Sequence, residues 1–335
     1  DVINDASAYS WATAGFFGRL NYDYKDRYFI AANIRYDGSS RFLRKDRWGT
    51  FGSFSLGWNV AREEFFPLDE ELMSQLKPRL SWGTLGNQNT TSYYPMYLLQ
   101  NVATNSGSWL MNDAYPTVAS VPGTIASSLT WETIKSLNVG FDLSMFNNRF
   151  TANFDYFIRK TLDMVGPAAE IAHIYGTGMP STNNTDLHTK GWELALNWRD
   201  QVGKVNYHVG FNISDARTFI DRYPNESKSL STYYEGQELN DIWGYETHGI
   251  AKSQAEMDEW LAAGNRPSWG SGWTEGDIMY VDQNGDGVIN TGANTLNDPG
   301  DRVKLGNSTP RFRFGLNLGL EWNNIDFSMF WQGVA

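Results

Sequence analysis

Ala14 to Gly38 divides into two strands and a turn from the alternation of apolar and polar residues alone. Apolar, aromatic or small residues stand at every second position from Phe16 to Tyr24, and the residues between them are mostly polar. This period of two is typical of a β-strand with one wet face and one dry face. After a turn at residues 25–27 the alternation resumes from Tyr28 to Tyr36. The stretch therefore predicts an antiparallel hairpin with arms of about ten residues, the length of a tilted strand that crosses a bilayer.

The same pattern returns along the whole chain and predicts ten strands. After the first hairpin the predicted strands lie at residues 48–60, 80–86, 137–145, 150–159, 192–198, 205–213, 312–322 and 325–331. Connections on one side are mostly tight turns of about two to five residues, whereas most of those on the other side have about thirty or more, as in outer-membrane barrels. The fold class predicted is all-β, an antiparallel transmembrane β-barrel portion with long extracellular loops. A soluble β-sandwich or β-propeller, which also alternates, is the alternative.

The stretches between these strands lose the period of two. Residues 62–75 change period and predict a short helix or turn at the rim of the barrel. One helix is predicted at residues 254–262, because Ser253 and Glu256 form a capping box and Gly264 follows. The long loops are predicted at residues 87–130, 160–189 and 215–310.

Composition narrows the class of protein. The chain has 335 residues, 41% hydrophobic and 15% aromatic, which is enough for a sizeable core, and no apolar run long enough for a membrane-spanning helix. Cysteine is absent, which excludes disulfides and thiol–metal sites. The net charge of −11 argues against nucleic acid as a partner, because phosphate binding requires clustered Lys and Arg.

Several segments resemble the C-terminal half of the barrel of SusC/RagA-type TonB-dependent transporters from the Bacteroidota outer membrane. They occur in the order of that family and lie at residues 16–42, 76–89, 129–157, 190–198, 276–290 and 301–334. The resemblance implies a barrel of about 22 strands, of which these residues would supply about ten. It also implies that the plug and the TonB box lie outside this chain, so we expect residues 1–335 to be a partial barrel domain.

The resemblance further implies active import across the outer membrane. The nutrients would be oligosaccharides, peptides or similar molecules, and a SusD-like surface lipoprotein would be the partner. The TonB complex would act through the N-terminal part, and outer-membrane lipid would surround the barrel. Two other functions remain open from the residues themselves: a soluble or surface glycan-binding module, and a passive porin. A plug and TonB box upstream would distinguish the importer from both.

One segment has the spacing of an EF-hand-type calcium loop. Oxygen-bearing residues stand at positions 1, 3, 5 and 9, glycine stands at position 6, and position 7 offers a backbone carbonyl: Asp282, Asn284, Asp286, Asn290, Gly287 and Val288. Position 12, normally an acidic ligand, is Ala293, and Asp301 can take its place only if residues 291–300 bulge out. An Asx-rich turn without metal explains the same residues, so Ca²⁺ is an optional ligand and no cofactor is required.

Aromatic residues crowd the longest loop: Trp243, Tyr245, Trp260, Trp269 and Trp273. Aromatic faces can stack on sugar rings, so Trp243, Tyr245, Trp269 and Trp273 are the candidate substrate-binding residues. Packing inside a folded loop is the alternative. The four histidines have no spacing that suggests a metal site or a catalytic triad, and no GxSxG motif occurs. The sequence therefore predicts that the chain is not an enzyme.

Overall fold

The computed structural model describes residues 10–89, 100, 102–104, 106–119, 129–167 and 181–335. The chain divides into two compact units, which we describe separately. The sheet unit comprises Asp1–Ala216 and Arg313–Gly333, and the loop unit comprises Arg217–Phe312 and Val334–Ala335. Within the described residues, no helix is long and apolar enough to cross a membrane.

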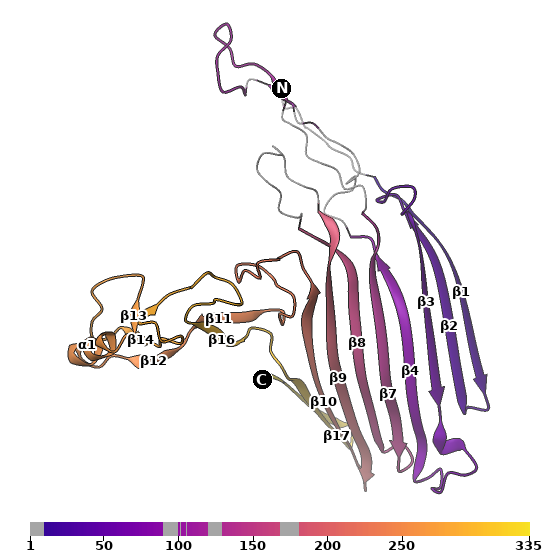
Figure 1. Cartoon of the computed structure of the whole chain (residues 1–335). Coiled ribbons are helices and arrows are strands. Elements are labelled where there is room, and N and C mark those ends of the chain that lie inside the picture. Colours follow the sequence, from indigo (N-terminus) through magenta and orange to yellow (C-terminus); the bar gives the residue numbers. More distant parts are fainter. Residues whose placement is uncertain (1–9, 90–99, 101, 105, 120–128, 168–180) are drawn as a thin grey trace. The chain divides into compact units, whose positions relative to one another are not determined.

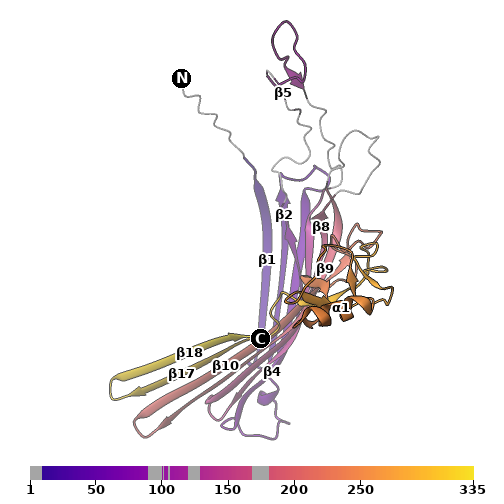
Figure 2. The same ribbon diagram turned by 90° about the vertical axis from the view of Figure 1, so that its left-hand side faces the viewer.

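The sheet unit is built on one sheet of ten strands (Figures 1 and 2). Its strands, in spatial order, are β1 (Thr13–Tyr24), β2 (Tyr28–Ser39), β3 (Trp48–Trp58), β4 (Met73–Asn87), β7 (Glu132–Met145), β8 (Phe150–Gly166), β9 (Thr182–Val202), β10 (Val205–Arg222), β17 (Arg313–Trp322) and β18 (Ile325–Val334). Two short strands, β5 (Val102–Ala103) and β6 (Val118–Ala119), pair with each other. All ten strands predicted from the alternation are confirmed.

The register of the strands separates an apolar face from a polar face. Side chains directly opposite each other in an antiparallel pair share a face. One row of such partners runs across seven strands and is apolar or aromatic throughout: Tyr22, Ile30, Leu56, Leu80, Val139, Tyr156 and Trp192. The adjacent row is mostly polar or small: Asn21, Ala31, Ser55, Ser81 and Asn138. The apolar row remains open in this chain, with Leu80 and Val139 41% and 49% exposed.

Two of the tight hairpin turns are formed by a pair of Asn residues, and their backbone conformation explains this choice. Asn323 and Asn324 have φ values of 44° and 67°, and Asn147 and Asn148 have values of 57° and 63°. Two successive residues with positive φ suit the right-handed twist of a hairpin, and Asn tolerates this conformation better than most residues.

Several strands are longer than predicted. β4 begins at Met73 rather than residue 80, β10 ends at Arg222, and β8 and β9 extend through both ends of the predicted loop at 160–189. That loop prediction is therefore wrong at both ends, and residues 168–180 of it lie outside the described residues. The extensions pair with register shifts near Thr161 and Met164 and carry polar residues on both faces, so they show no period of two. The helix or turn predicted at 62–75 is confirmed as turns at residues 64–65 and 70–72. The 3-10 helix η1 (Val60–Arg62) overlaps only its first residue, and its last three residues belong to β4.

The predicted loop at 215–310 is largely a folded unit with its own small core. It contains β11 (Asp241–Tyr245), β12 (Thr247–Ile250), α1 (Gln254–Ala262), β13 (Arg266–Pro267), β14 (Ile278–Tyr280), β15 (Val288–Ile289) and β16 (Arg302–Asn307). Ala251, Met257 and Met279 form a buried cluster against which Trp260 and Trp273 pack. Helix α1 is confirmed at the predicted residues, and the Ser253 side chain caps it by accepting a hydrogen bond from the Glu256 N–H at 3.3 Å.

Candidate functional site

The apolar face of the sheet carries an aromatic pair near each end. Tyr28 stacks on Trp58 at the turn end, with ring centroids 6.4 Å apart. Tyr36 stacks on Trp48 at the other end, with ring centroids 4.8 Å apart. Tyr36 follows Tyr28 by eight positions in β2, about 27 Å along an extended strand. At the tilt of about 35–45° found in outer-membrane barrels this gives roughly 20 Å of height, most of the apolar band of about 25 Å that aromatic girdles flank on both sides.

The polar face carries a charged network at mid-strand. The Arg79 Nη2 atom lies 3.0 Å from an oxygen of Asp142 and 3.0 Å from an oxygen of Asp155. Asn153 donates a hydrogen bond to Asp142 at 2.7 Å. A groove of about 530 Å³ opens beside this network and is lined in part by Asn21, Ser55, Lys77, Arg79, Ser81 and Asn138. Such a face suits a water-filled lumen and not lipid.

An aromatic cluster on the polar face was missed by the sequence reading. Phe51 belongs to the polar face of β3, yet it is buried with Phe42 and Trp131. Trp131 donates a hydrogen bond from Nε1 to the Arg47 carbonyl oxygen at 3.1 Å. A Cβ at Gly86 would lie 2.0 Å from the Phe51 ring, so only glycine leaves room for this ring. The signal in the sequence was an aromatic residue out of phase with its strand, with glycine at nearby positions.

The EF-hand-like loop is folded around its first carboxylate. The two Asp282 oxygens accept hydrogen bonds from the N–H groups of Gly285 and Gly287, each at 2.7 Å. The Asp286 carboxylate accepts from the Val288 N–H at 2.8 Å. Burial raises the pKa of Asp282, but the hydrogen bonds from Gly287 and Gly285, with further ones from Asp301 and Asp286, outweigh it and hold the pKa below its ordinary value. The carboxylate is thus charged at neutral pH, as a cation ligand must be.

The insertion after the loop does bulge out, which was the condition for Asp301 to reach the loop. A Cβ built on Gly300 would lie 2.4 Å from the Gly292 nitrogen and 2.3 Å from the Asn290 carbonyl oxygen, so the two ends of the insertion touch. Gly292 and Gly300 both have positive φ, 54° and 62°, which permits this closure. Asp301 then returns beside Asn290 and donates its own N–H to the Asn290 carbonyl at 3.0 Å.

Asp301 is fully buried, and its carboxylate bonds to backbone N–H groups at both ends of the EF-hand-like loop. Its Oδ1 accepts hydrogen bonds from the N–H groups of Gln283 at 2.8 Å and Asn284 at 3.4 Å. Its Oδ2 accepts from the Asn290 N–H at 2.8 Å. We call this set of hydrogen bonds the Asp301 clasp. Within the described ranges, no three His, Cys, Asp or Glu side chains lie close enough to hold a metal ion on their own. Any cation here would therefore depend on Asn and backbone oxygens as well.

The candidate aromatic residues separate into different environments. Tyr245 and Trp269 lie 4.6 Å apart between ring centroids, and both contact Tyr280, at 5.9 and 5.6 Å. Tyr280 was not among the predicted residues. Trp273 meets Tyr280 edge-on at 6.3 Å but also packs on the core of the loop unit. Among the residues that the structure describes, Trp243 makes none of these ring contacts and lies opposite Lys304 in the β11–β16 pair.

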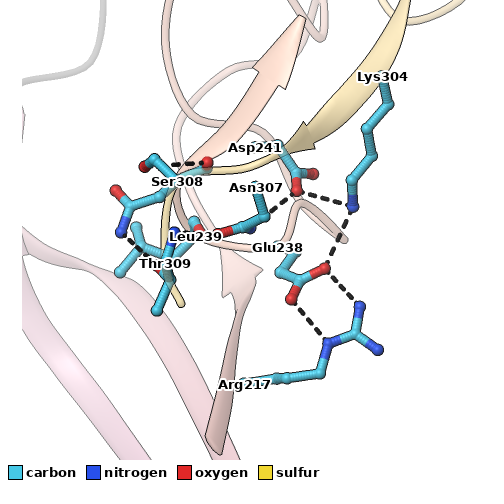
Figure 3. Close-up of polar contacts among 9 residues, drawn as sticks. Arg217, Glu238, Leu239, Asp241, Lys304, Asn307, Ser308 and Thr309 are labelled. Atoms are coloured by element: carbon cyan, nitrogen blue, oxygen red, sulfur yellow. Dashed lines mark hydrogen bonds and ion pairs between the residues drawn. The ribbon is translucent and has the colours of Figure 1, made fainter. Parts of the chain in front are cut away.

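A charge cluster with two buried carboxylates and two partly exposed cations connects the beginning of the loop unit to β11 and β16 (Figure 3). Glu238 is 7% exposed and is bound by Arg217 through two hydrogen bonds, one of them 2.7 Å from the Arg217 Nε. Lys304 lies 3.1 Å from Glu238 and 2.7 Å from Asp241, whose side chain is 4% exposed. The hydrogen bond from Arg217 lowers the pKa of Glu238 to about 2. Burial opposes this shift, and the hydrogen bond from Lys304 adds to it. The hydrogen bond to Asp241 raises the pKa of Lys304.

Comparison with known proteins identifies the family to which this chain belongs. The family described as TonB dependent receptor-like, beta-barrel matches residues 2–334. TonB-dependent receptor P26 of Formosa agariphila is 32% identical over 96% of this chain and 31% of its own length. TonB-dependent receptor SusC of Bacteroides thetaiotaomicron is 28% identical over 93% of this chain and 30% of its own length. The chain therefore spans about a third of the length of these relatives.

A solved structure has the same fold. The structure of the RagAB peptide importer in the closed-closed state aligns with a TM-score of 0.71 and 22% identity, over 97% of this chain and 33% of the other. The chain belongs to the TonB dependent receptor-like β-barrel family. It is an outer-membrane β-barrel portion, and the resemblance to SusC/RagA-type barrels is confirmed. The family is not one of enzymes, in agreement with the sequence reading.

Proposed function

We propose that the whole protein imports a nutrient actively across the outer membrane, powered by the TonB complex. The observation that supports this most is the family match over residues 2–334. The sheet agrees with it, because its apolar face suits lipid and its face around Arg79 suits a solvated lumen. Oligosaccharides, peptides or similar nutrients are the proposed cargo. A SusD-like surface lipoprotein is the proposed partner, and its co-purification with the tagged full-length protein tests that assignment.

Uptake by cells that contain or lack the TonB complex tests the proposed import. We expect accumulation of a labelled oligosaccharide or peptide mixture above its external concentration only when the full-length protein and the TonB complex are both present. Passive movement down a gradient that continues without the TonB complex would indicate a porin instead. Retention at the cell surface without entry would indicate a binding module.

We also propose that the loop at residues 282–290 holds Ca²⁺. The ligands would be the side chains of Asp282, Asn284, Asp286 and Asn290 and the Val288 carbonyl, with Asp301 at the remaining position, and binding would draw the three carboxylates closer together than they lie in the described structure. The chemistry of this set fits, because all donors are oxygens and hard cations prefer oxygen. Asp301 is the proposed substitute for the acidic ligand at position 12, and the closed insertion, which returns Asp301 beside Asn290, supports this proposal. The cation would supply positive charge that offsets the repulsion among these carboxylates.

Calcium is expected to protect the loop unit from proteases. In the full-length protein, about 1 mM Ca²⁺ should slow cleavage within residues 265–302 relative to a chelator, since extracellular sites of this type bind at about 0.1–1 mM. Asp286→Ala should abolish this protection, because it removes one charged ligand. Asp258→Ala is the matched control, because Asp258 is an exposed carboxylate on α1 that accepts a hydrogen bond from Gln254. Unchanged calcium content and unchanged cleavage in Asp286→Ala would favour the turn without metal.

A further inference from the structure

We infer that Tyr245, Trp269 and Tyr280 form one platform for the apolar face of an uncharged sugar ring, and that Asp301 is the residue that positions it. The inference rests on the proposed import function for its biological meaning, because it names the ligand that the loop unit would receive. It differs from the set predicted from sequence, since Tyr280 enters and both Trp243 and Trp273 leave.

The platform is a contact set of three rings from three separate segments. Tyr245 ends β11, Tyr280 ends β14, and Trp269 follows β13 after one intervening residue. The centroid distances of 4.6, 5.6 and 5.9 Å place each ring against both others. Tyr280 meets Tyr245 and Trp269 at interplanar angles of 71° and 67°, so the platform is angled and not flat. All three side chains are partly exposed and none belongs to the buried core cluster. Trp269 is followed by Gly270, whose φ of 71° turns the chain away immediately after the indole.

The Asp301 clasp connects directly to two of these segments. The Asp301 Oδ1 accepts a hydrogen bond from the N–H of Gln283, which follows Tyr280 by three residues. Its Oδ2 accepts a hydrogen bond from the Asn290 N–H. The carbonyl of the neighbouring Ile289 accepts a hydrogen bond from the Ser268 N–H at 2.8 Å. Ser268 immediately precedes Trp269. The clasp therefore fixes the chain on both sides of the Trp269–Tyr280 contact.

The third ring is connected to the same residue through the β11–β16 pair. Tyr245 lies opposite Arg302 in that pair, and Arg302 follows Asp301 in the chain. Because Asp301 is fully buried, its carboxylate has little freedom to move. The Asp301 carboxylate thus fixes the backbone near Trp269 and Tyr280, and its place next to Arg302 in the chain connects it to Tyr245.

The polar surroundings point to a neutral sugar. Sugar rings present C–H groups to aromatic faces and hydroxyl groups to the sides, where carboxylates and amides can bond to them. Glu246 follows Tyr245 in the chain, is exposed, and accepts a hydrogen bond from the exposed Gln283 at 2.6 Å. Residues 217–312 contain 8 Lys and Arg and 15 Asp and Glu, a net charge of −7. The negative electrostatic field of this net charge repels anionic sugars such as uronates and sulfated sugars.

Binding measurements on the purified full-length protein test the platform without requiring transport. The probes are neutral hexasaccharides (maltohexaose, cellohexaose, laminarihexaose and mannohexaose), a hexamer of galacturonate, and a Trp-rich neutral peptide. We expect at least one neutral hexasaccharide to bind, and Trp269→Ala to weaken it about tenfold through the lost stacking area. Trp243→Ala is the matched control and should leave affinity unchanged.

The positioning role of Asp301 is tested by two pairs of readouts: near-ultraviolet circular dichroism and sugar affinity report the three rings, whereas the far-ultraviolet spectrum and barrel folding report general destabilisation. Asp301→Ala should weaken the same binding and reduce the near-ultraviolet circular dichroism of the coupled rings, while barrel folding and the far-ultraviolet spectrum stay unchanged. Asp301→Asn keeps one acceptor oxygen and should restore part of both signals. Asp258→Ala should change neither. Near-ultraviolet signal and affinity that both survive Asp301→Ala would overturn the positioning role.

Three outcomes would overturn the platform: no binding of any neutral hexasaccharide, unchanged affinity in Trp269→Ala, or preference for the galacturonate hexamer or the peptide. These outcomes are separable from failure of the proposed import. Transport that lacks TonB dependence, together with binding that depends on Trp269, would reject only the import. TonB-dependent transport with binding that ignores Trp269 would reject only the platform.

Discussion

Arginine at Leu316 is expected to reduce the amount of folded protein in the outer membrane sharply, whereas arginine at the next residue is expected to be tolerated. Leu316 lies opposite Phe211 on the apolar face, and Asn317 lies opposite Gly210 on the polar face. An arginine near the bilayer midplane on the lipid side of a barrel costs about 2 to 4 kcal/mol. An arginine on the polar side reaches water and retains its hydration. The folded fraction in isolated membranes, measured by heat-modifiable gel mobility, gives the comparison.

A second variant on the same strand tests whether the face and not the position decides the result. Leu318→Arg should behave like Leu316→Arg, because Leu318 lies opposite Val209 on the same face. Equal damage from Leu316→Arg and Asn317→Arg would mean that both faces are packed against protein. Damage from Asn317→Arg alone would mean that the apolar face points inward.

The strands could be predicted because lipid on one side and water on the other impose a period of two. Where a strand extends beyond the lipid, the alternation of apolar and polar residues stops. β9 was predicted at residues 192–198 but runs from Thr182 to Val202, and its first half, rich in Thr and Asn, pairs with the end of β8. Backbone hydrogen bonding continues there without an apolar face, so alternation could not mark the true ends of the strand.

The calcium-type loop could be recognised in the sequence because its candidate ligands are close together in the chain, whereas the position of Asp301 could not be predicted. That position depends on Gly292 and Gly300 meeting across the insertion, which is a tertiary contact. The aromatic residues show the same limit. Sequence crowding selected Trp243, but β-pairing sets it opposite Lys304 and brings Tyr280 to Tyr245 instead.

The charge cluster around Glu238 gave no signal in the sequence, because its members come from distant parts of the chain. Arg217, Glu238 and Lys304 are separated by 21 and 66 residues and meet only when β11 pairs with β16. No local motif requires them. Ion pairs of this kind become visible only when the register of the paired strands is known.

Removal of the Lys304 charge is expected to loosen the loop unit. Lys304→Met leaves the nearly buried carboxylates of Glu238 and Asp241 with Arg217 as the remaining cation of the cluster in Figure 3. Breaking a fully buried pair costs about 3–5 kcal/mol. Because the Lys304 side chain is 42% exposed, water screens part of this, and we expect about 2 kcal/mol. Amide hydrogen exchange at residues 236–241 and 302–307 of the full-length protein should accelerate about thirtyfold. Lys252→Met, which alters an exposed lysine, should leave exchange unchanged.

The same cluster gives the loop unit a dependence on acid that one substitution should remove. The pKa of Glu238 falls from 4.5 to about 2 in the folded protein. A carboxyl group with a lowered folded pKa stabilises the protein above its unfolded pKa, and this contribution is lost as the pH falls toward the folded pKa. Exchange at residues 236–241 should therefore accelerate as the pH falls from about 4.5 to about 2, after correction for the intrinsic rate. Glu238→Gln should already exchange faster at neutral pH and should show a flatter response to acid. An equally steep response in Glu238→Gln would assign the acid sensitivity to another carboxylate and would contradict the role of the Arg217–Glu238–Lys304 contacts.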